Sequence, residues 1–128
     1  MTIVLDTNAY SDFKRGSVSV VQVLESSEDF FFNETATTEI YTDFRLGSRQ
    51  KQNVDELHQF LDRPGVRVVP IDHGVARRYG DIVAALRYAG TPIPTNDIWI
   101  AAVAIEQNGE LLTRDEHFNN VPMLRLHI

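Results

Sequence analysis

Four acidic residues stand at matching points of the elements that the sequence predicts. Asp6 and Asp115 each follow a short apolar run that is typical of a buried strand. Glu39 and Asp97 each fall in the first turn of a predicted helix. In a parallel α/β fold, strand ends and the N-termini of the following helices meet at one edge of the sheet, where ligands bind. We therefore expect these four carboxylates to converge in a small volume.

Carboxylates packed together without compensation repel one another, and some of them take up protons. A divalent cation removes that penalty, and a set of oxygen ligands with no Cys or local His suits Mg²⁺ or Mn²⁺ rather than zinc. Sites that hold two such ions about 4 Å apart cleave phosphodiesters by stabilising the attacking and leaving oxygens. The alternative for each acid alone is a helix cap or a solvated charge. Four acids at matching points favour the shared metal site.

The elements that must position these acids alternate between strands and helices. The predicted strands are 3–5, 30–32, 66–71, 111–113 and 124–128. The predicted helices are 17–27, where many Val residues leave a strand as the alternative, 37–47, 50–62, 72–90 and 96–108. We expect a polar connecting segment between Asn8 and Ser17. This alternation indicates an α/β domain with a mostly parallel sheet of four or five strands.

The 128 residues fit a single domain, residues 1–128, and a hydrophobic content of 43% with 23% charged residues is typical of a globular protein. No apolar run approaches the roughly 20 residues of a membrane span. No basic segment precedes the first strand, so we expect no secretory signal. The absence of Cys excludes disulfides and thiolate metal sites, and it is consistent with a cytoplasmic location.

The formal net charge of −6 argues against non-specific binding to nucleic acid, whose phosphates attract basic surfaces. A cluster of carboxylates that holds divalent cations produces the same imbalance, and local basic patches are compatible with it. The charge therefore leaves a nucleic-acid substrate open.

Four segments of the chain carry a resemblance in their residue types, order and spacing. They are Val4–Asn8, Thr38–Ile40 with Gly47 eight residues after the acid, Asn96–Ala102 and Leu112–Phe118. Together they resemble a PIN-domain ribonuclease, most of all the VapC-type toxin of VapBC toxin–antitoxin pairs. The resemblance covers essentially the whole chain.

This resemblance implies a three-layer α/β/α sandwich with a mostly parallel central sheet, and an endonuclease that cleaves RNA with Mg²⁺ or Mn²⁺. By position, the catalytic and metal-binding acids would be Asp6, Glu39, Asp97 and Asp115. Asn8 and Thr113 match the polar residues that commonly support them; Thr113 would orient a carboxylate or water, or it simply ends its strand. Activated water would attack in line, with Asp97 or Asp115 as the proton acceptor, and would leave a 5′-phosphate and a 3′-hydroxyl.

The chain departs from the family at His117, because many members have a second acid at that position. The number of metals, one or two, therefore stays open, and Glu116 or the substrate phosphate could supply the missing oxygen. His117 itself is a proton-transfer group, a substitute ligand or a surface histidine, and the last is the simplest interpretation.

Several basic residues are candidates for gripping RNA phosphates around the acidic centre. They are Arg114, Lys14, Arg15 and Arg45, with Arg49, Lys51 and Arg87 as further candidates. Arg114 is the strongest of them because it directly precedes Asp115. The alternative for all of them is a solvated charge.

Two other enzyme classes with an acidic sheet edge fit less well. A phospho-receiver domain would need a second acid near the end of the first strand and a lysine near the last strand, and the only lysines are Lys14 and Lys51. A dehalogenase-like phosphatase would need an Asp two residues after Asp6, where the chain has Asn8. The remaining alternative is a non-catalytic PIN-like module that binds RNA or protein.

The resemblance also implies partners. Such toxins usually form homodimers, and a small antitoxin silences them by covering the acidic groove, often with a basic residue that an acidic pocket would attract. We therefore expect an antitoxin, an RNA substrate and a homodimer, and no membrane.

Overall fold

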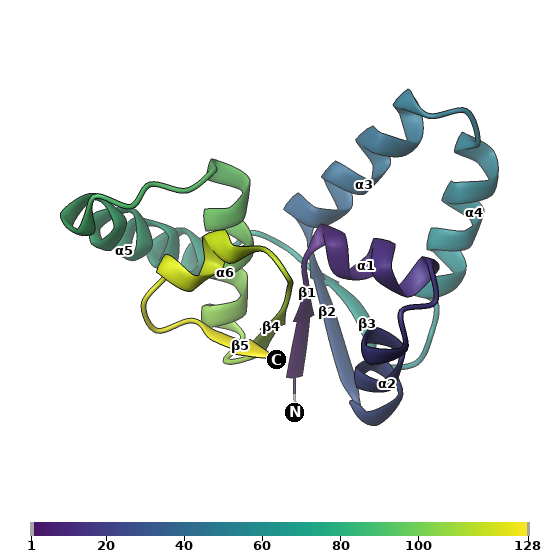
Figure 1. Ribbon diagram of the computed structural model, residues 1–128, viewed down its shortest axis with the longest axis horizontal. Coiled ribbons are helices and arrows are strands. Elements are labelled where there is room, and N and C mark those ends of the chain that lie inside the picture. Colours follow the sequence, from purple (N-terminus) through teal and green to yellow (C-terminus); the bar gives the residue numbers. More distant parts are fainter. Residues whose placement is uncertain (1, 128) are drawn as a thin grey trace.

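The computed structural model describes residues 2–127 of the chain. Within that range, five strands and six α-helices alternate, with one short 3₁₀ helix, η1 (Figure 1). The strands are β1 (Thr2–Leu5), β2 (Asp29–Asn33), β3 (Val66–Val69), β4 (Glu110–Leu112) and β5 (Arg125–His127). The helices are α1 (Thr7–Lys14), α2 (Val18–Ser26), α3 (Glu34–Leu46), α4 (Gln50–Leu61), α5 (His73–Ala89), α6 (Thr95–Glu106) and η1 (Glu116–Asn120).

The five strands form one parallel sheet in the order β3-β2-β1-β4-β5. Every pairing is parallel, and in the centre of the sheet Leu5 of β1 lies between Phe32 of β2 and Leu112 of β4. Ile3, Val4 and Leu5 are fully buried, as a strand covered on both faces requires. The predicted mostly parallel sheet of four or five strands is confirmed.

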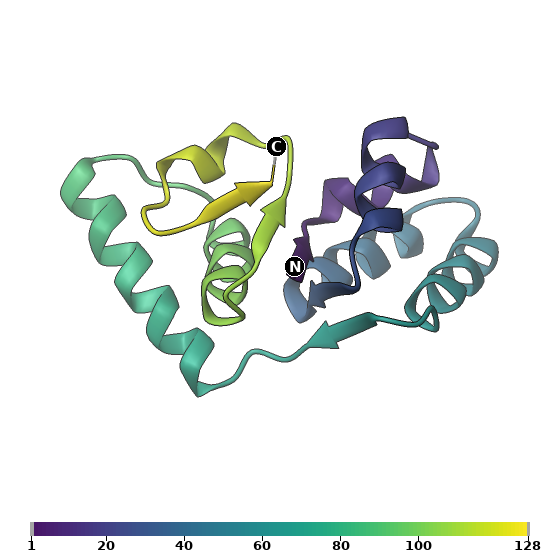
Figure 2. The same ribbon diagram turned by 90° about the horizontal axis from the view of Figure 1, so that it is seen from below.

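Helices cover both faces of the sheet, which gives the predicted three-layer α/β/α sandwich. Crossovers between parallel strands are right-handed, so the side on which the helices lie depends on the direction in which the chain moves across the sheet. The chain steps outward from β1 to β2 and β3, with α1 to α4 on one face (Figures 1 and 2). It then returns past β1 to β4, with α5 and α6 on the opposite face (Figure 2).

The hydrophobic cores on the two faces of the sheet differ in composition. On the first face, Tyr10 of α1 and Phe60 of α4 pack edge to face around Phe32 of β2, with ring centroids 5.3–5.8 Å apart. On the second face, α6 is buried almost all round, as its sequence predicts, and Ala101 to Ala104 are completely buried. Trp99 of α6 packs on Tyr79 of α5, with ring centroids 4.1 Å apart, so it is partly buried against the core rather than an exposed stacking surface.

The main differences from the predicted elements concern helix starts. The segment after Asn8, predicted as a polar connection, is helix α1, and Asp6 is its N-cap. Helix α3 begins at Glu34 rather than near residue 37, so Glu39 lies in its second turn and not in its first. The segment with many Val residues is a helix, α2, which excludes the strand alternative.

The strand boundaries shift by one or two residues. Strand β3 ends at Val69, before Pro70, which has no N–H to continue the ladder. Strand β4 covers residues 110–112 and leaves Thr113 just outside the sheet. Strand β5 begins at Arg125, and residue 128, predicted to end it, lies outside the described residues.

No helix among residues 2–127 is long and apolar enough to span a bilayer.

Candidate functional site

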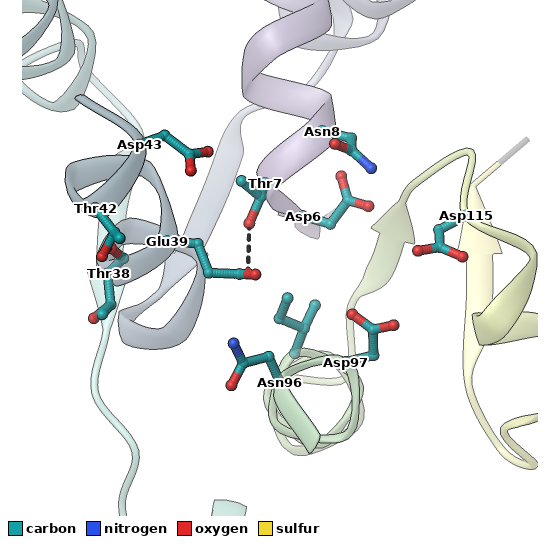
Figure 3. A pocket seen from close by; sticks show the side chains of 11 residues that line it. Asp6, Thr7, Asn8, Thr38, Glu39, Thr42, Asp43, Asn96, Asp97 and Asp115 are labelled. Atoms are coloured by element: carbon teal, nitrogen blue, oxygen red, sulfur yellow. Dashed lines mark hydrogen bonds between the residues drawn. The ribbon is translucent and has the colours of Figure 1, made fainter. Parts of the chain in front are cut away.

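The site lies where the direction of the chain across the sheet reverses, beyond the carboxyl ends of β1 and β4. From these neighbouring strands the chain leaves toward opposite faces, which opens a crevice, and ligands bind at such switch points in open α/β sheets. A cleft at this point is lined by all four predicted acids, Asp6, Glu39, Asp97 and Asp115 (Figure 3). The four predicted acids thus line one cleft, and of the four, Asp97 and Asp115 belong with His117 to a group whose ligand atoms lie within 4.8 Å of one another.

Asp6 directly follows β1 and uses its two carboxylate oxygens differently. Oδ1 accepts a hydrogen bond from the Ala9 backbone N–H at 2.7 Å, which caps α1. Oδ2 accepts a short hydrogen bond from the Thr113 hydroxyl. Burial, with smaller contributions from the nearby charges of Asp115 and Asp97, raises the pKa of Asp6 to about 6 despite these hydrogen bonds.

Asp97 and Asp115 face Asp6 from the other side of the cleft (Figure 3). Asp97 lies in the first turn of α6, as predicted, and Asp115 is the N-cap of η1. Burial raises the pKa of Asp97, and repulsion from Asp115 and Glu39 adds to that effect. A half-buried carboxylate among other carboxylates is the electrostatic arrangement that a bound cation relieves.

Glu39 reaches the cleft from α3, on the side opposite Asp115 (Figure 3). Its Oε1 accepts a hydrogen bond from the Thr7 hydroxyl at 2.8 Å. Thr7, in the first turn of α1, therefore fixes the side chain of a residue that lies 32 positions further along the chain, in α3. Asn8 also lines the cleft with an exposed amide. The rest of the cleft wall is formed by Thr38, Thr42, Asp43, Asn96 and Ile100.

Thr113 links two of the acids. Its Oγ1 donates to Asp6 Oδ2 and accepts the Asp115 backbone N–H at 3.0 Å. Because Thr113 lies just beyond β4, it holds the end of β4 against the end of β1. Of the two predicted interpretations, the structure supports a Thr113 that orients a carboxylate over one that merely ends its strand.

Arg114, the strongest predicted RNA-binding residue, is already paired. Its Nε and Nη2 donate to the two carboxylate oxygens of Asp12 at 2.6 and 2.8 Å. Asp12 is a buried residue of α1 and also accepts from Arg15 at 2.7 Å. Burial alone would raise the pKa of Asp12, but the hydrogen bonds from Arg114 and Arg15 outweigh burial and lower it. Arg114 thus connects the chain between Thr113 and Asp115 to α1.

The other predicted basic residues lie outside the cleft wall. Lys14 forms an ion pair with Glu56 of α4 at 2.5 Å. Arg45 contacts Gln50 at 3.4 Å, and its side chain is exposed at the end of α3. None of the basic residues predicted to bind RNA is among the residues that line the acidic cleft.

His117 is closer to the acids than its interpretation as a simple surface residue implies. Its Nδ1 lies 3.0 Å from Asp97 Oδ2 and 3.2 Å from Asp115 Oδ1. The three residues offer ligand atoms that all lie within 4.8 Å of one another. The expectation that no His lies near the acids is therefore wrong.

Two contributors to the site were not predicted. Thr7 is one of them, although a hydroxyl directly after a strand-end acid is a signal that indicates a supporting role. Asp12 lies in the segment predicted as a polar connection. Its pairing with Arg114 spans 102 positions, and nothing in the local sequence indicates it.

The donor set suits a divalent cation. The four carboxylates offer hard oxygen atoms, and the imidazole of His117 lies at their edge. Burial raises the pKa values of Asp6 and Asp97, and repulsion between the acids adds to that effect. Mg²⁺ and Mn²⁺ both prefer carboxylate oxygens as ligands.

Comparisons with known proteins agree with this architecture. A family model of the PIN domain matches residues 3–124. A sequence search of curated proteins gives no significant match. Among solved structures, VapBC2 from Rickettsia felis, bound to a promoter DNA fragment, superimposes with a TM-score of 0.89 at 24% identity, covering 99% of this chain and 98% of that chain.

Two further structures are similar over nearly the same length. VapBC-1 from nontypeable Haemophilus influenzae gives a TM-score of 0.87 at 20% identity, covering 99% of this chain and 97% of that chain. FitAcB from Neisseria gonorrhoeae gives 0.80 at 28% identity, with 98% and 96% covered. Since the family model spans nearly every described residue and the acids meet at the reversal point of the sheet, the chain belongs to the PIN domain family.

Proposed function

We propose that this chain is a metal-dependent endoribonuclease and the toxin of a type II toxin–antitoxin pair. The observation that carries the nuclease assignment is the single cleft lined by four carboxylates from β1, α3, α6 and the β4–η1 connection. One carboxylate in a cleft is a common surface feature, whereas four from separate segments at a switch point support a cation site.

In this proposal the residues that hold Mg²⁺ or Mn²⁺ are Asp6, Glu39, Asp97 and Asp115. The cation, when bound, lowers the pKa of a coordinated water and stabilises charge on the scissile phosphate. The chain itself positions the ligands: Thr113 fixes the Asp6 carboxylate and Thr7 fixes Glu39. Asp97 or Asp115 accepts the proton of the attacking water. Asn8 lines the cleft, where its amide can contact the substrate.

The toxin assignment rests on the neighbours. VapBC and FitAcB structures resemble this chain over nearly its full length. VapC20 from Mycobacterium tuberculosis, similar with a TM-score of 0.69 at 13% identity, is described as a toxin that cleaves the sarcin-ricin loop. By analogy the partner is a small antitoxin with a basic side chain that enters the acidic cleft, the toxin forms a homodimer, and both act in the cytoplasm.

Cleavage of RNA tests the nuclease assignment. The purified chain is incubated with total RNA and Mg²⁺ or Mn²⁺, and the 5′ ends of the products are sequenced. We expect discrete cuts that leave a 5′-phosphate, no cuts with EDTA, and loss of cleavage in Asp6→Asn and Asp97→Asn. Asp81→Asn, the same change at an exposed position of α5, is the matched control and should cut like the wild type.

Equal degradation by the wild type, Asp6→Asn and Asp97→Asn would mean a contaminating nuclease and would contradict the proposal. A wild type that binds RNA without cutting it would support the alternative, a non-catalytic PIN-like module.

Co-purification tests the partner. If the gene directly upstream encodes a short protein, we expect that protein to co-purify with the tagged chain and to suppress both RNA cleavage and growth inhibition. An isolated gene whose overexpressed product leaves growth unchanged would contradict the toxin assignment without affecting the nuclease assignment.

A further inference from the structure

His117 stands at the edge of the carboxylate cluster with its ring turned toward two of the acids. Its Nδ1 lies 3.0 Å from Asp97 Oδ2 and 3.2 Å from Asp115 Oδ1. Its backbone N–H donates to Asp115 Oδ1 at 2.9 Å, so the η1 turn fixes the position of the residue relative to Asp115. The same ring nitrogen is thus within reach of an oxygen from α6 and an oxygen from the β4–η1 connection.

These separations match the spacing between neighbouring ligands of one cation. Adjacent ligands of an octahedral ion with bonds of about 2.1–2.2 Å lie about 3.0–3.1 Å apart. The Nδ1 of His117 therefore already stands, relative to both carboxylates, at the distance that two ligands of a shared metal adopt. All three donor atoms fall within 4.8 Å of one another, which one ion can span.

The exposure of the three side chains leaves room for an ion and its waters. Asp97 and Asp115 are 16% and 28% exposed, and His117 is 51% exposed. The donors therefore face a partly open space rather than a packed interior.

We propose that His117 is a nitrogen ligand of the divalent cation, together with Asp97 and Asp115, and that it makes the site selective for Mn²⁺ over Mg²⁺. This inference rests on the metal site of the proposed function and specifies the metal. Mn²⁺ shares the preference of Mg²⁺ for carboxylate oxygens, but as a first-row transition metal it also accepts an imidazole nitrogen, although more weakly than Fe²⁺ to Zn²⁺ do. Mg²⁺ keeps to oxygen ligands and retains its waters. A site with one imidazole and several carboxylates binds Mn²⁺ with an additional favourable ligand that Mg²⁺ uses poorly.

A substitution series separates a ligand from a surface residue. His117→Ala removes the nitrogen, and His117→Asp replaces it with oxygen. His73→Ala removes an exposed histidine at the start of α5 and is the matched control. Isothermal titration calorimetry of the metal-free full chain with Mn²⁺ and separately with Mg²⁺ gives the affinities without any RNA.

We expect the wild type to bind Mn²⁺ at least about tenfold more tightly than Mg²⁺, which corresponds to about 1.4 kcal/mol. His117→Ala should lose most of that preference by weakening Mn²⁺ binding and leaving Mg²⁺ binding nearly unchanged. His117→Asp should reverse the preference toward Mg²⁺. His73→Ala should bind both metals like the wild type.

Electron spin-echo envelope modulation of the Mn²⁺-loaded protein reports the ligand directly. We expect ¹⁴N modulation from a coordinated imidazole in the wild type and in His73→Ala, and its absence in His117→Ala and His117→Asp. Bound Mn²⁺ without ¹⁴N modulation in the wild type, or an equal loss of Mn²⁺ and Mg²⁺ affinity in His117→Ala, would overturn the role of His117. Metal-dependent RNA cleavage in that case would show that the proposed function still holds. A wild type that binds neither metal would overturn both.

Discussion

Asp6 combines a structural and a chemical role because its two oxygens face different groups. One oxygen caps α1 through Ala9, and the other accepts from Thr113 at the cleft. The side chain is only 3% exposed, so an ionised carboxylate at this position is costly in the absence of a cation. The two interpretations of a strand-end acid, helix cap and metal ligand, are therefore compatible in one residue.

This cost predicts that Asp6→Asn stabilises the metal-free protein in a pH-dependent way. Burial raises the pKa of Asp6 from 3.8 to about 6, so the folded state retains a proton that the unfolded state has lost. Stability should fall as the pH rises from 4 to 6 and stay at the lower level above 6. One unit of pKa corresponds to about 1.4 kcal/mol, so the penalty at pH 7.5 is about 3 kcal/mol.

Thermal unfolding in EDTA checks this prediction. At pH 7.5 the Asn variant should melt about 10 °C above the wild type, and at pH 4 the two should be similar. The matched control Asp81→Asn should show no such pH-dependent difference. An Asp6→Asn variant that is no more stable than the wild type at pH 7.5 would contradict the cost of burying Asp6.

Thr113 should control metal affinity through the orientation of Asp6. Thr113→Val keeps the shape of the side chain but removes the hydroxyl that donates to Asp6 and accepts from the Asp115 N–H. We expect Mn²⁺ affinity, measured by calorimetry, to fall about 10–100-fold, as for other groups that orient metal ligands. Thr113→Ser retains the hydroxyl and should bind like the wild type; equal weakening in both variants would assign the effect to packing instead.

The β4–η1 connection depends on α1, an element at the other end of the chain. Arg114 forms a two-point ion pair with the buried Asp12, and its neighbours Thr113 and Asp115 both belong to the site. The contact therefore ties the site to helix α1. It also leaves Arg114 fewer donors for a phosphate than an unpaired arginine would have.

Asp12→Asn should loosen this connection. We expect a loss of about 1–2 kcal/mol of unfolding free energy at pH 7, the range for hydrogen bonds to charged groups when one partner is partly exposed, and weaker Mn²⁺ binding. Because the pKa of Asp12 is lowered, the ion pair stabilises the folded state at neutral pH and is lost only when acid protonates Asp12. The difference in unfolding free energy between wild type and Asp12→Asn should therefore shrink as the pH falls through the pKa of Asp12. Asp55→Asn on α4, an exposed site, should change neither quantity. Unchanged melting and metal affinity in Asp12→Asn would show that the ion pair has no positioning role.

The elements differed in how well the sequence could predict them. Residues 3–5 and α6 are apolar enough that burial on all sides decides their structure. Helix α1 was missed because the buried side of its short, mostly polar sequence consists of Ala9, Tyr10 and Asp12. The start of α3 predicted near residue 37 is too late because the Asn33 side chain caps the helix through the Ala36 N–H.

At the scale of the whole molecule, the four acids could be predicted because topology brings strand ends and helix starts to one edge of a parallel sheet. Contacts between side chains could not be predicted in the same way. The hydrogen bond from Thr7 to Glu39 and the approach of His117 to Asp97 depend on how α1, α3, α6 and η1 pack.

The cleft should make the stability of the whole chain depend on metal. A cation that binds only the folded state stabilises it by mass action, by about 2.7 kcal/mol at a concentration 100 times the Kd. We expect Mn²⁺ to raise the melting temperature of the wild type, EDTA to reverse the increase, and Glu39→Gln with Asp97→Asn to abolish it. An equal increase in that double variant would locate the metal outside the cleft.

A crystal structure of the Mn²⁺-soaked chain, with anomalous data collected at the manganese edge, tests the central claim most directly. The account predicts an anomalous peak inside the cleft, within coordinating distance of Asp97 and Asp115 and facing Asp6 and Glu39. An empty cleft at saturating Mn²⁺, or a peak only elsewhere on the surface, would contradict a shared metal site and with it the proposed nuclease.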